Sequence, residues 1–175
     1  MANMPLYAIG EKEPIIDEEA FVHPDAVIIG DVTIGPEATV WPGAVLRGDR
    51  GAIRVGAATS IQDGTVVHCT STLDTVIGEY CVVGHRVHLE GCTIEDDALI
   101  GSGSVVLHNV VIGSGALVGA QALVTNGTHV PPLAMALGVP ARIRENAVEP
   151  GAHRAGADVY VDNGHWFARE MRRLD

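Results

Sequence analysis

Residues 94–124 read IEDDAL-IGSGSV-VLHNVV-IGSGAL-VGAQAL-V, with an aliphatic side chain at the start of every group of six. The same spacing recurs through most of the chain in four runs: Val22, Ile28, Ile34, Val40 and Leu46; Val55, Ile61 and Val67; Ile77, Val83 and Leu89; and Ile94, Ile100, Val106, Ile112, Val118, Val124 and Val130. A period of six fits neither a single helix nor an alternating strand. It is typical of a hexapeptide repeat, in which three short strands form one turn of a parallel β-helix, so we expect an all-β protein of that class.

The composition agrees with this class and narrows the range of partners. Hydrophobic residues make up 47% of the chain but aromatic residues only 4%, which suits a narrow prism filled by Val, Ile, Leu and Ala. The formal net charge is −11. A chain this acidic is repelled by phosphate backbones and anionic lipids, so we expect neither nucleic acid nor a membrane as a partner.

Several absences in the sequence favour a cytoplasmic protein. The first ten residues, MANMPLYAIG, contain neither the basic segment nor the apolar segment of a secretion signal. No apolar run approaches the roughly 18 residues that a membrane span needs. The three cysteines, Cys69, Cys81 and Cys92, are odd in number and lack CxxC spacing, so we expect buried, reduced thiols and no disulfide framework.

The pattern divides the chain into four segments. Residues 1–21 form a lead-in, residues 22–144 carry the β-helix, residues 145–157 form a linker around Pro150, and residues 158–175 form a C-terminal helix. The apolar positions of this last segment have helical spacing: Tyr160, Gly164, Phe167, Met171 and Leu174. We expect this helix to begin at an Asp158 cap and to pack on the β-helix.

The repeat also determines which polar residues become neighbours. The residue after each buried position points outward, and equivalent positions on successive coils lie about 4.8 Å apart. Two outward loops, near Gly48–Arg54 and Cys69–Thr75, keep the register. With these offsets, Arg47, His68 and Glu90 are predicted to stack in one column on one face of the prism.

The adjacent face is predicted to carry Gln62, Asp63 and His85, with Asp63 and His85 one coil apart. If such prisms pack around a threefold axis, the first face of one chain meets the second face of the next. His68 and Glu90 could then share a metal ion with the His85 of a neighbouring copy. Two histidines and one carboxylate, with a position left open, are typical of catalytic zinc and of ferrous sites. A purely structural alternative is an intersubunit salt bridge of Arg47 with Asp63 or Asp49.

Together these residues resemble the gamma-class carbonic anhydrases, which have a left-handed β-helix of hexapeptide repeats. The resemblance extends from about Ile15 to Arg144. It rests on WPGAVLRGD (Trp41–Asp49), IQDGTVVH (Ile61–His68), VGH (Val83–His85), GSGSVVL (Gly101–Leu107) and GVPAR (Gly138–Arg142). The hexapeptide repeat alone is less specific, because many acyltransferases share it.

The resemblance implies a homotrimer with one divalent metal at each subunit interface and reversible hydration of carbon dioxide to bicarbonate. His68 and His85 match two of the family's three histidine ligands. The residues beside the metal in the family are matched by Arg47, Asp49, Gln62 and Asp63. Zinc is the first expectation for the metal, with Fe(II) or cobalt as alternatives.

The third ligand departs from the family pattern. Where the family reads GHxxxLHGC, this chain reads GHRVHLEGC, so Glu90 stands at the expected histidine. Three outcomes stay open: Glu90 binds the metal, His88 substitutes for it, or no metal is held. We expect His88 to point elsewhere, because it lies at a different place in the hexapeptide. A carboxylate ligand offsets part of the metal's charge, so we expect a weak anhydrase that works mainly at higher pH.

Further differences leave other functions open. The family's acidic loop with a proton-shuttling glutamate is absent from Cys69–Asp74, and His88 or His108 could relay protons instead. A metal-free trimer that acts as a binding or assembly protein is one alternative. A hexapeptide acyltransferase is another, and His108 is the repeat histidine that could serve as its general base.

Overall fold

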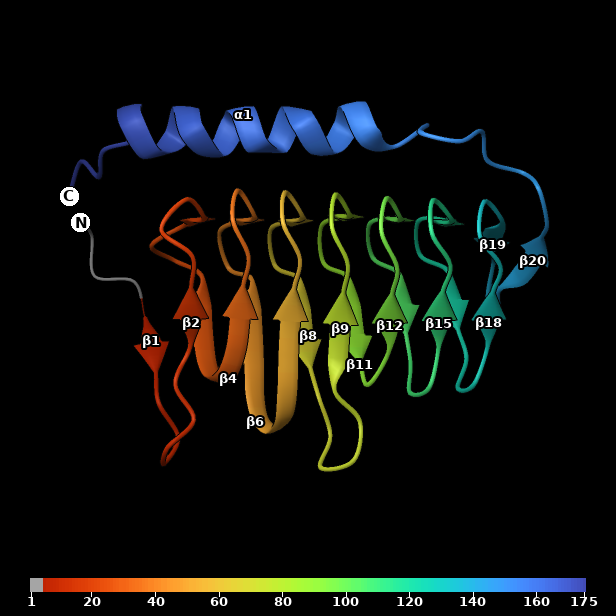
Figure 1. Cartoon of the computed structure of the whole chain (residues 1–175), viewed down its shortest axis with the longest axis horizontal. Helices are drawn as coiled ribbons and strands as arrows, with labels where there is room; N and C mark the ends of the chain where they lie inside the picture. The colour runs from red at the N-terminus through yellow and green to blue at the C-terminus, as the bar shows by residue number, and fades with distance from the viewer. Residues whose placement is uncertain (1–4) are drawn as a thin grey trace.

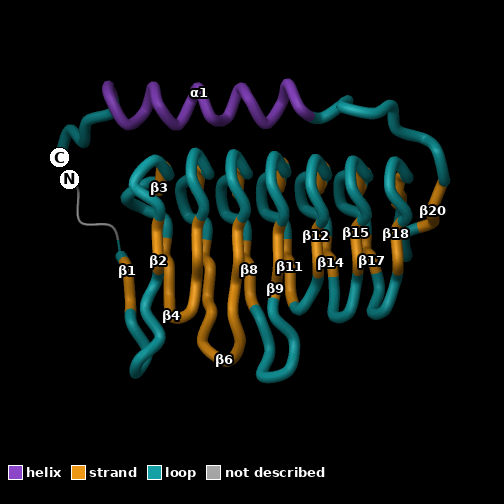
Figure 2. The backbone as a smooth tube through the Cα atoms, in the orientation of Figure 1, coloured by secondary structure: helices purple, strands orange, loops and turns teal. Residues whose placement is uncertain are grey.

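The computed structural model describes residues 5–175, which form a β-helix with one long helix beside it (Figure 1). Short parallel strands stack coil upon coil, and the helix runs along the stack (Figure 2). The prediction of an all-β, left-handed parallel β-helix with a C-terminal α-helix is confirmed.

The strands form two sheets. The larger sheet contains β1 (Leu6–Tyr7), β2 (Ile15–Ile16), β4 (Val27–Ile34), β6 (Val45–Val55), β8 (Val66–His68), β9 (Thr75–Ile77), β11 (His88–Glu90), β12 (Thr93–Ile94), β14 (Val105–Val106), β15 (Val111–Ile112), β17 (Leu123–Val124) and β18 (His129–Val130). The smaller sheet contains β3 (Phe21–Val22), β5 (Thr39–Val40), β7 (Ser60–Ile61), β10 (Val82–Val83), β13 (Leu99–Ile100), β16 (Leu117–Val118), β19 (Met135–Leu137) and β20 (Arg142–Arg144). All pairings are parallel except that of β19 with β20.

The core is the column of aliphatic residues that the six-residue spacing marks. Every one of these positions from Val22 to Val130 is buried in a single hydrophobic cluster. Each side chain removed from water contributes about 1.5–3 kcal/mol, so the repeat itself stabilises the stack. The three cysteines are also buried and free, as expected.

The lead-in is part of the β-helix, and the predicted boundary at Val22 is too late. Strand β1 pairs with β4 through Leu6 and Ile28, and β2 pairs with β4 through Ile15 and Thr33. The backbone groups of β4 would otherwise form an open sheet edge, which these two short strands cover. Residues 1–4 of the predicted lead-in lie outside the described residues.

The first predicted loop is an irregularity within a long strand. Between β4 and β6, Gly30 pairs with Gly48 and Val32 with Ile53, so one residue of β4 faces four residues of β6. A Cβ at Gly48 would lie 2.3 Å from the Asp31 carbonyl oxygen, so only glycine allows this approach. We call the bend in the middle of β6, residues 48–54, the β6 bend. The β6 bend and the segment between β8 and β9 both extend beyond the neighbouring coils (Figure 1).

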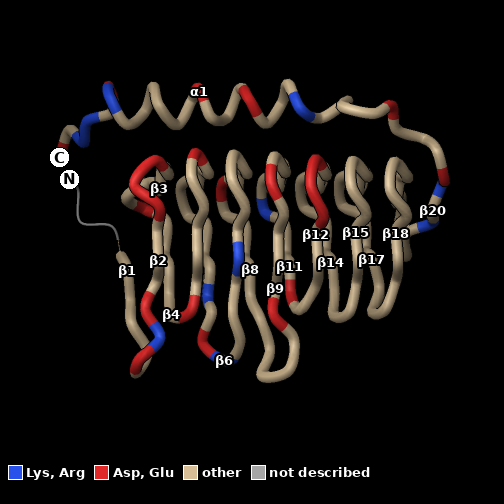
Figure 3. Tube along the Cα trace, in the orientation of Figure 1, with Lys and Arg blue, Asp and Glu red and all other residues tan. Residues whose placement is uncertain are grey.

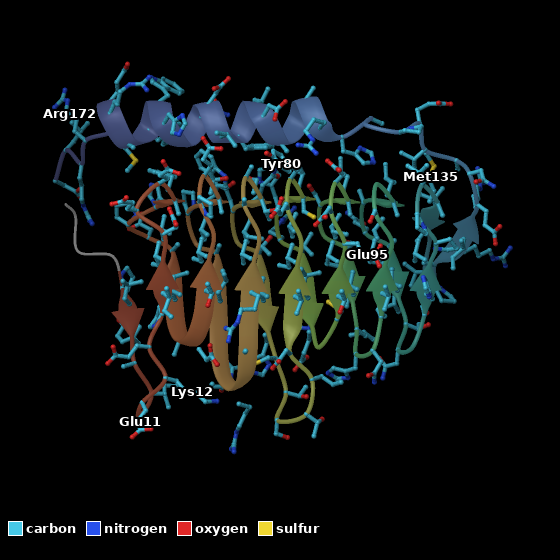
Figure 4. All side chains as sticks on the ribbon, in the orientation of Figure 1. Glu11, Lys12, Tyr80, Glu95, Met135 and Arg172 are labelled. Atoms are coloured by element: carbon cyan, nitrogen blue, oxygen red, sulfur yellow. The ribbon has the colours of Figure 1, made fainter. Side chains whose placement is uncertain are left out.

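The C-terminal helix α1 spans Arg154–Glu170, so the predicted range 158–175 starts too late and ends too late. His153 occupies the N-cap position without a side-chain capping bond, and the predicted Asp158 lies inside the helix. A tertiary contact sets the start instead of a cap. The Arg154 guanidinium lies 3.4 Å from the centre of the Tyr80 ring and donates a 2.9 Å hydrogen bond to Asp97. Tyr80 lies beneath the helix (Figure 4).

The predicted linker, residues 145–157, is also more ordered than expected. The backbone N–H groups of Ala147 and Val148 both donate to the Leu133 carbonyl oxygen, and Val148 is buried. The last four residues of the range already belong to α1. The segment therefore closes the final coil instead of crossing open solvent.

The helix packs on β3, β5 and β7 through part of its predicted apolar face. The rings of Tyr160 and Phe167 lie 6.1 and 5.1 Å from the ring of Trp41. Gly164 is buried, whereas Met171 and Leu174 follow the helix and are 40% and 81% exposed. The prediction that the segment packs on the β-helix thus holds for the helix itself and fails for its last two apolar residues.

Charge is distributed unevenly along the stack (Figure 3). The chain contains no Asp, Glu, Lys or Arg from Ala98 to Ala141. Acidic residues gather in the earlier coils and at their corners beneath the helix (Figure 3). Within residues 5–175, no helix combines the length and the apolar character needed to cross a bilayer.

Candidate functional site

The predicted polar column is present on the larger sheet. Arg47 on β6 pairs with His68 on β8, and His68 pairs with Glu90 on β11. Each of the three follows a fully buried aliphatic residue that points inward, namely Leu46, Val67 and Leu89, and strand alternation therefore turns these three side chains outward. The register prediction is therefore confirmed, whereas the roles of these residues as metal ligands stay predictions.

His68 lies at the centre of a network that includes the β6 bend. Its Nε2 lies 2.9 Å from Asp49 Oδ1 and its Nδ1 lies 2.9 Å from Glu90 Oε1. Asp49 also accepts a hydrogen bond from Arg47. Carboxylates only accept, so a His68 nitrogen that hydrogen-bonds to one of them does so through its N–H group, and binding of an ion at that nitrogen replaces the proton.

The two carboxylates of this network are held in the anionic form. Burial alone would raise the pKa of Asp49, but hydrogen bonds from His68 and Arg47 outweigh it and lower the pKa to about 2. Burial likewise opposes ionisation of Glu90, and the hydrogen bond and charge of His68 lower the pKa of Glu90 below its usual value. Both groups are therefore available as acceptors or ligands near neutral pH.

The prediction that His88 points elsewhere is wrong. His88 and Glu90 lie two residues apart on β11, so their side chains leave the same side of the strand. His88 Nε2 lies 3.3 Å from Glu90 Oε2, and His108 Nε2 lies 3.6 Å from the same oxygen. Sequence reasoning missed the position of His108, since the turn after β14 carries it toward Glu90.

The adjacent face carries the other predicted residues. His85 Nδ1 lies 3.0 Å from Asp63 Oδ2, which confirms that the two are one coil apart. The side chain of His85 is 52% exposed, and its Nε2 makes no hydrogen bond to any described residue. Gln62 is only 4% exposed. Within one chain, His85 does not join the His68–Glu90 pair.

Two further contacts fix the β6 bend that carries Asp49. Lys12, the one lysine of the sequence, donates from Nζ to the carbonyl oxygens of Asp49 and Arg50 at 3.1 and 3.0 Å (Figure 4). On the other side, Asp74 Oδ1 accepts a 2.7 Å hydrogen bond from the Ala52 N–H group. No spacing in the sequence points to Lys12, because its partners are 37 and 38 residues away.

The fit of these residues to a metal ion depends on how many donors one chain supplies. Among residues 5–175, no group of three His, Cys, Asp or Glu side chains is arranged to hold one within a single chain. Two ligands of one tetrahedral zinc ion lie about 3.4 Å apart, and His68 Nδ1 lies 2.9 Å from Glu90 Oε1. A widening of about 0.5 Å would thus admit an ion between them. The pair thus fits two positions of a metal site.

The outer contacts also fit such a site. Metal-binding histidines usually donate their other ring nitrogen to a carboxylate, which orients the ring. Asp49 stands in this position for His68, and Asp63 stands in it for His85. The side chain of His85 is moreover half-exposed.

Comparison with protein families identifies the repeat. The model for bacterial transferase hexapeptide repeats matches residues 13–48, 74–106 and 91–126. These ranges cover about half of the chain. They leave out residues 49–73, which contain most of the β6 bend and the first part of the segment between β8 and β9.

Two groups of relatives are similar in sequence. Gamma carbonic anhydrase 2 of Arabidopsis thaliana mitochondria is 44% identical over 132 residues, which are 72% of this chain and 48% of that protein. The chain spans about half the length of the two plant carbonic anhydrases that it matches. The carnitine operon protein CaiE of Escherichia coli K12 is 39% identical over 161 residues, which are 91% of this chain and 82% of that protein.

Solved structures extend the likeness over nearly the whole chain. A hexapeptide transferase family protein from Anaplasma phagocytophilum superimposes with a TM-score of 0.89 at 36% identity and covers 95% of this chain and 99% of its own. A Bacillus cereus protein assigned provisionally as an acetyltransferase gives a TM-score of 0.90 at 33% identity, with 94% and 97% covered.

Proposed function

The chain belongs to the gamma carbonic anhydrase-like proteins of the hexapeptide-repeat family, and on that premise we propose that it is a homotrimer that hydrates carbon dioxide reversibly at metal sites between its subunits. The observation that carries the proposal is the arrangement of the donors. His68 and Glu90 lie together on one face, and His85 is exposed on the adjacent face with Asp63 behind it. Two neighbouring chains thus offer complementary parts of one ligand set.

The proposed ligands are His68 and Glu90 of one chain and His85 of a neighbouring copy. Two imidazoles and a carboxylate suit zinc, with Fe(II) or cobalt as alternatives. A divalent cation held in this way supplies Lewis acidity, which is the chemistry that hydration of carbon dioxide requires. Glu90 carries a negative charge that a histidine would not, so we expect slower turnover at neutral pH than with three neutral ligands.

The remaining residues of the site would bind and orient. Arg47 presents a planar set of donors that suits bicarbonate, and its contact with Asp49 fixes its direction. Gln62 is buried beside Asp63 on the face that carries His85, where its amide can orient a small polar substrate. Asp49 links substrate binding to metal binding, because it contacts both Arg47 and His68.

Metal content per chain is the first test. We expect about one zinc, iron or cobalt per chain in the wild type. Glu90→Ala, His68→Ala and His85→Ala should each lose it, with loss of carbon dioxide hydration. His129→Ala is the matched control, because His129 is an exposed histidine on β18 outside the polar column. Wild-type protein without metal would contradict the proposal.

Mixed trimers test whether the site lies between chains. When His68→Ala and His85→Ala chains are unfolded together and refolded in equal amounts, some interfaces combine an intact His68 with an intact His85. Random assembly should restore about a quarter of the wild-type metal, since each of the two positions is intact at half of the interfaces. A site contained within one chain would restore none.

Two other functions have specific support. The replacement of the family's third histidine by Glu90 favours a metal-free binding or assembly protein, which the metal measurement would reveal. The likeness to the Bacillus cereus protein favours an acyltransferase. His108 is its candidate base, although the Nε2 atom of His108 is buried. Calorimetric titration with acetyl-coenzyme A separates this function, since a carbonic anhydrase should give no binding heat.

A further inference from the structure

The carboxylate of Glu90 is surrounded by histidines of its own chain. Oxygen Oε1 lies 2.9 Å from His68 Nδ1, whereas Oε2 lies 3.3 Å from His88 Nε2 and 3.6 Å from His108 Nε2. The three histidines come from β8, from β11 and from the turn after β14, so three successive coils converge on this one side chain. The two oxygens therefore have different partners.

The environment of His108 shows that this convergence is built into the fold. Its Nε2 atom is buried and has no hydrogen bond among the described residues, although its side chain is 35% exposed overall. Buried polar atoms in folded proteins nearly always have a partner, and the nearest charged group is the Glu90 carboxylate. A movement of about 0.5 Å would bring the two atoms into hydrogen-bond distance.

Gly91 makes the room for this ring. A Cβ at Gly91 would lie 3.1 Å from His108 Cδ2 and 3.0 Å from Leu73 Cβ. The residue also has a φ of +61°, which side chains rarely adopt. A larger residue after Glu90 would force His108 or Leu73 to shift. The segment from His88 to Gly91 is thus shaped to hold His108 near Glu90.

We propose that His88 and His108 are positioning residues that hold Oε2 of Glu90, so that Oε1 is presented beside His68 as a metal ligand. The inference rests on the proposed metal site. A glutamate has three rotatable bonds and can swing away from an ion, whereas an imidazole is rigid. Contacts from two imidazole rings to the second oxygen remove this freedom. Glu90, which replaces the histidine of the family pattern, is therefore accompanied by two histidines, His88 and His108, that hold its carboxylate in place.

The test measures zinc affinity by competition with a chelator. His88→Phe and His108→Phe keep an aromatic ring but remove the nitrogen that faces Glu90. We expect each variant to bind zinc about 10- to 100-fold more weakly, the usual effect of losing a group that orients a ligand. His88→Gln retains an N–H donor and should recover most of the affinity. His129→Phe is the control and should bind as the wild type does.

A second set of variants shows whether the effect passes through Glu90. With Glu90→His in the background, no carboxylate remains to be positioned. Adding His88→Phe and His108→Phe to that background should change zinc affinity less than about threefold. An equal loss in both backgrounds would overturn the proposal, because the two residues would then act on the fold or directly on the ion.

The outcomes separate the two proposals. If the wild type binds zinc and His88→Phe and His108→Phe bind it equally well, the positioning role fails and the proposed function stands. If the wild type binds no zinc, both fail. Melting temperatures in the presence of a chelator complete the test. A variant that melts as the wild type does without metal has lost affinity through the site and not through its fold.

Discussion

The coils before Asp97 and those after it are built from the same repeat but differ in what they carry. From Ala98 to Ala141 the six-residue spacing runs without an offset and without a charged residue. The earlier coils contain the β6 bend, the segment between β8 and β9, and the whole polar column. The regular period produces a stack that needs no charge, and the candidate site lies where that period is interrupted.

The candidate site lies at the interruption because a regular coil has few residues outside its strands and turns. Its strands are two residues long, and each corner is a tight turn. Such a coil offers few side chains that can reach past the next coil. The bend in β6 adds residues to one edge, which brings Asp49 beside Arg47 and His68. Lys12 and Asp74 then hold the bend from outside the repeat.

The largest expected effect is a loss of stability in the regular coils. Ile100 is fully buried on β13, and Ile100→Ala should lower the free energy of unfolding by about 3 kcal/mol, because the cavity cannot close around a rigid stack. Metal content of the folded fraction should not change. Urea unfolding at fixed protein concentration measures the effect. Val66→Ala, at a site that is 39% exposed, should cost less than about 0.5 kcal/mol.

The next effect concerns the helix that packs on the earlier coils. A Cβ at Gly164 would lie 2.7 Å from Thr39 Cγ2, so Gly164→Ala should destabilise the protein by about 1–3 kcal/mol through overpacking. At Gly156 the nearest atom to a Cβ is 4.0 Å away. Gly156→Ala should therefore stabilise the helix by about 0.5–1 kcal/mol. Thermal melting of both variants measures the difference, and a shared sign would contradict this packing.

The features that follow from the six-residue spacing and those that depend on single contacts differ in how well the sequence predicts them. One aliphatic residue is needed for each side of every coil, so the spacing predicts the whole buried column and, through it, the stacking of Arg47, His68 and Glu90. The spacing does not predict structure that is determined by an individual tertiary contact. The start of α1 depends on Arg154 meeting Tyr80, and the bend of β6 depends on Lys12, and neither contact has a period.

The wrong prediction for His88 has a different cause. His88 and Glu90 hold different positions in the hexapeptide, but β11 is three residues long, so both side chains point outward on either side of Leu89. The contact with His108 depends in addition on a turn and on Gly91. Such details depend on side-chain direction and local room, which a repeat pattern does not contain.

A smaller effect is expected from loosening the β6 bend. Asp74→Ala removes the acceptor of the Ala52 N–H group, and leaving that group without a partner should cost about 1 kcal/mol. Amide exchange in residues 48–54 should become several-fold faster, while exchange in the regular coils stays the same. Asp74→Asn keeps an acceptor oxygen and should exchange nearly as the wild type does. Equal acceleration in both halves would mean that the bend is not a separate unit.

The last prediction concerns two buried thiols of the earlier coils, which we expect to react only slowly. Burial raises the pKa of Cys81 and of Cys92 to about 12. A raised pKa keeps each thiol protonated until the pH approaches that value, and only the thiolate attacks an alkylating reagent. At pH 8, iodoacetamide should modify both residues at least about 100-fold more slowly in the native protein than in urea, as mass spectrometry of the peptides can measure. Rapid labelling of the native chain would show that the earlier coils open, and that their interior is less closed than the buried column of the regular coils. Slow labelling would mean that the interiors of the two halves are equally closed. The halves would then differ only at the surface, where the polar column and the β6 bend lie.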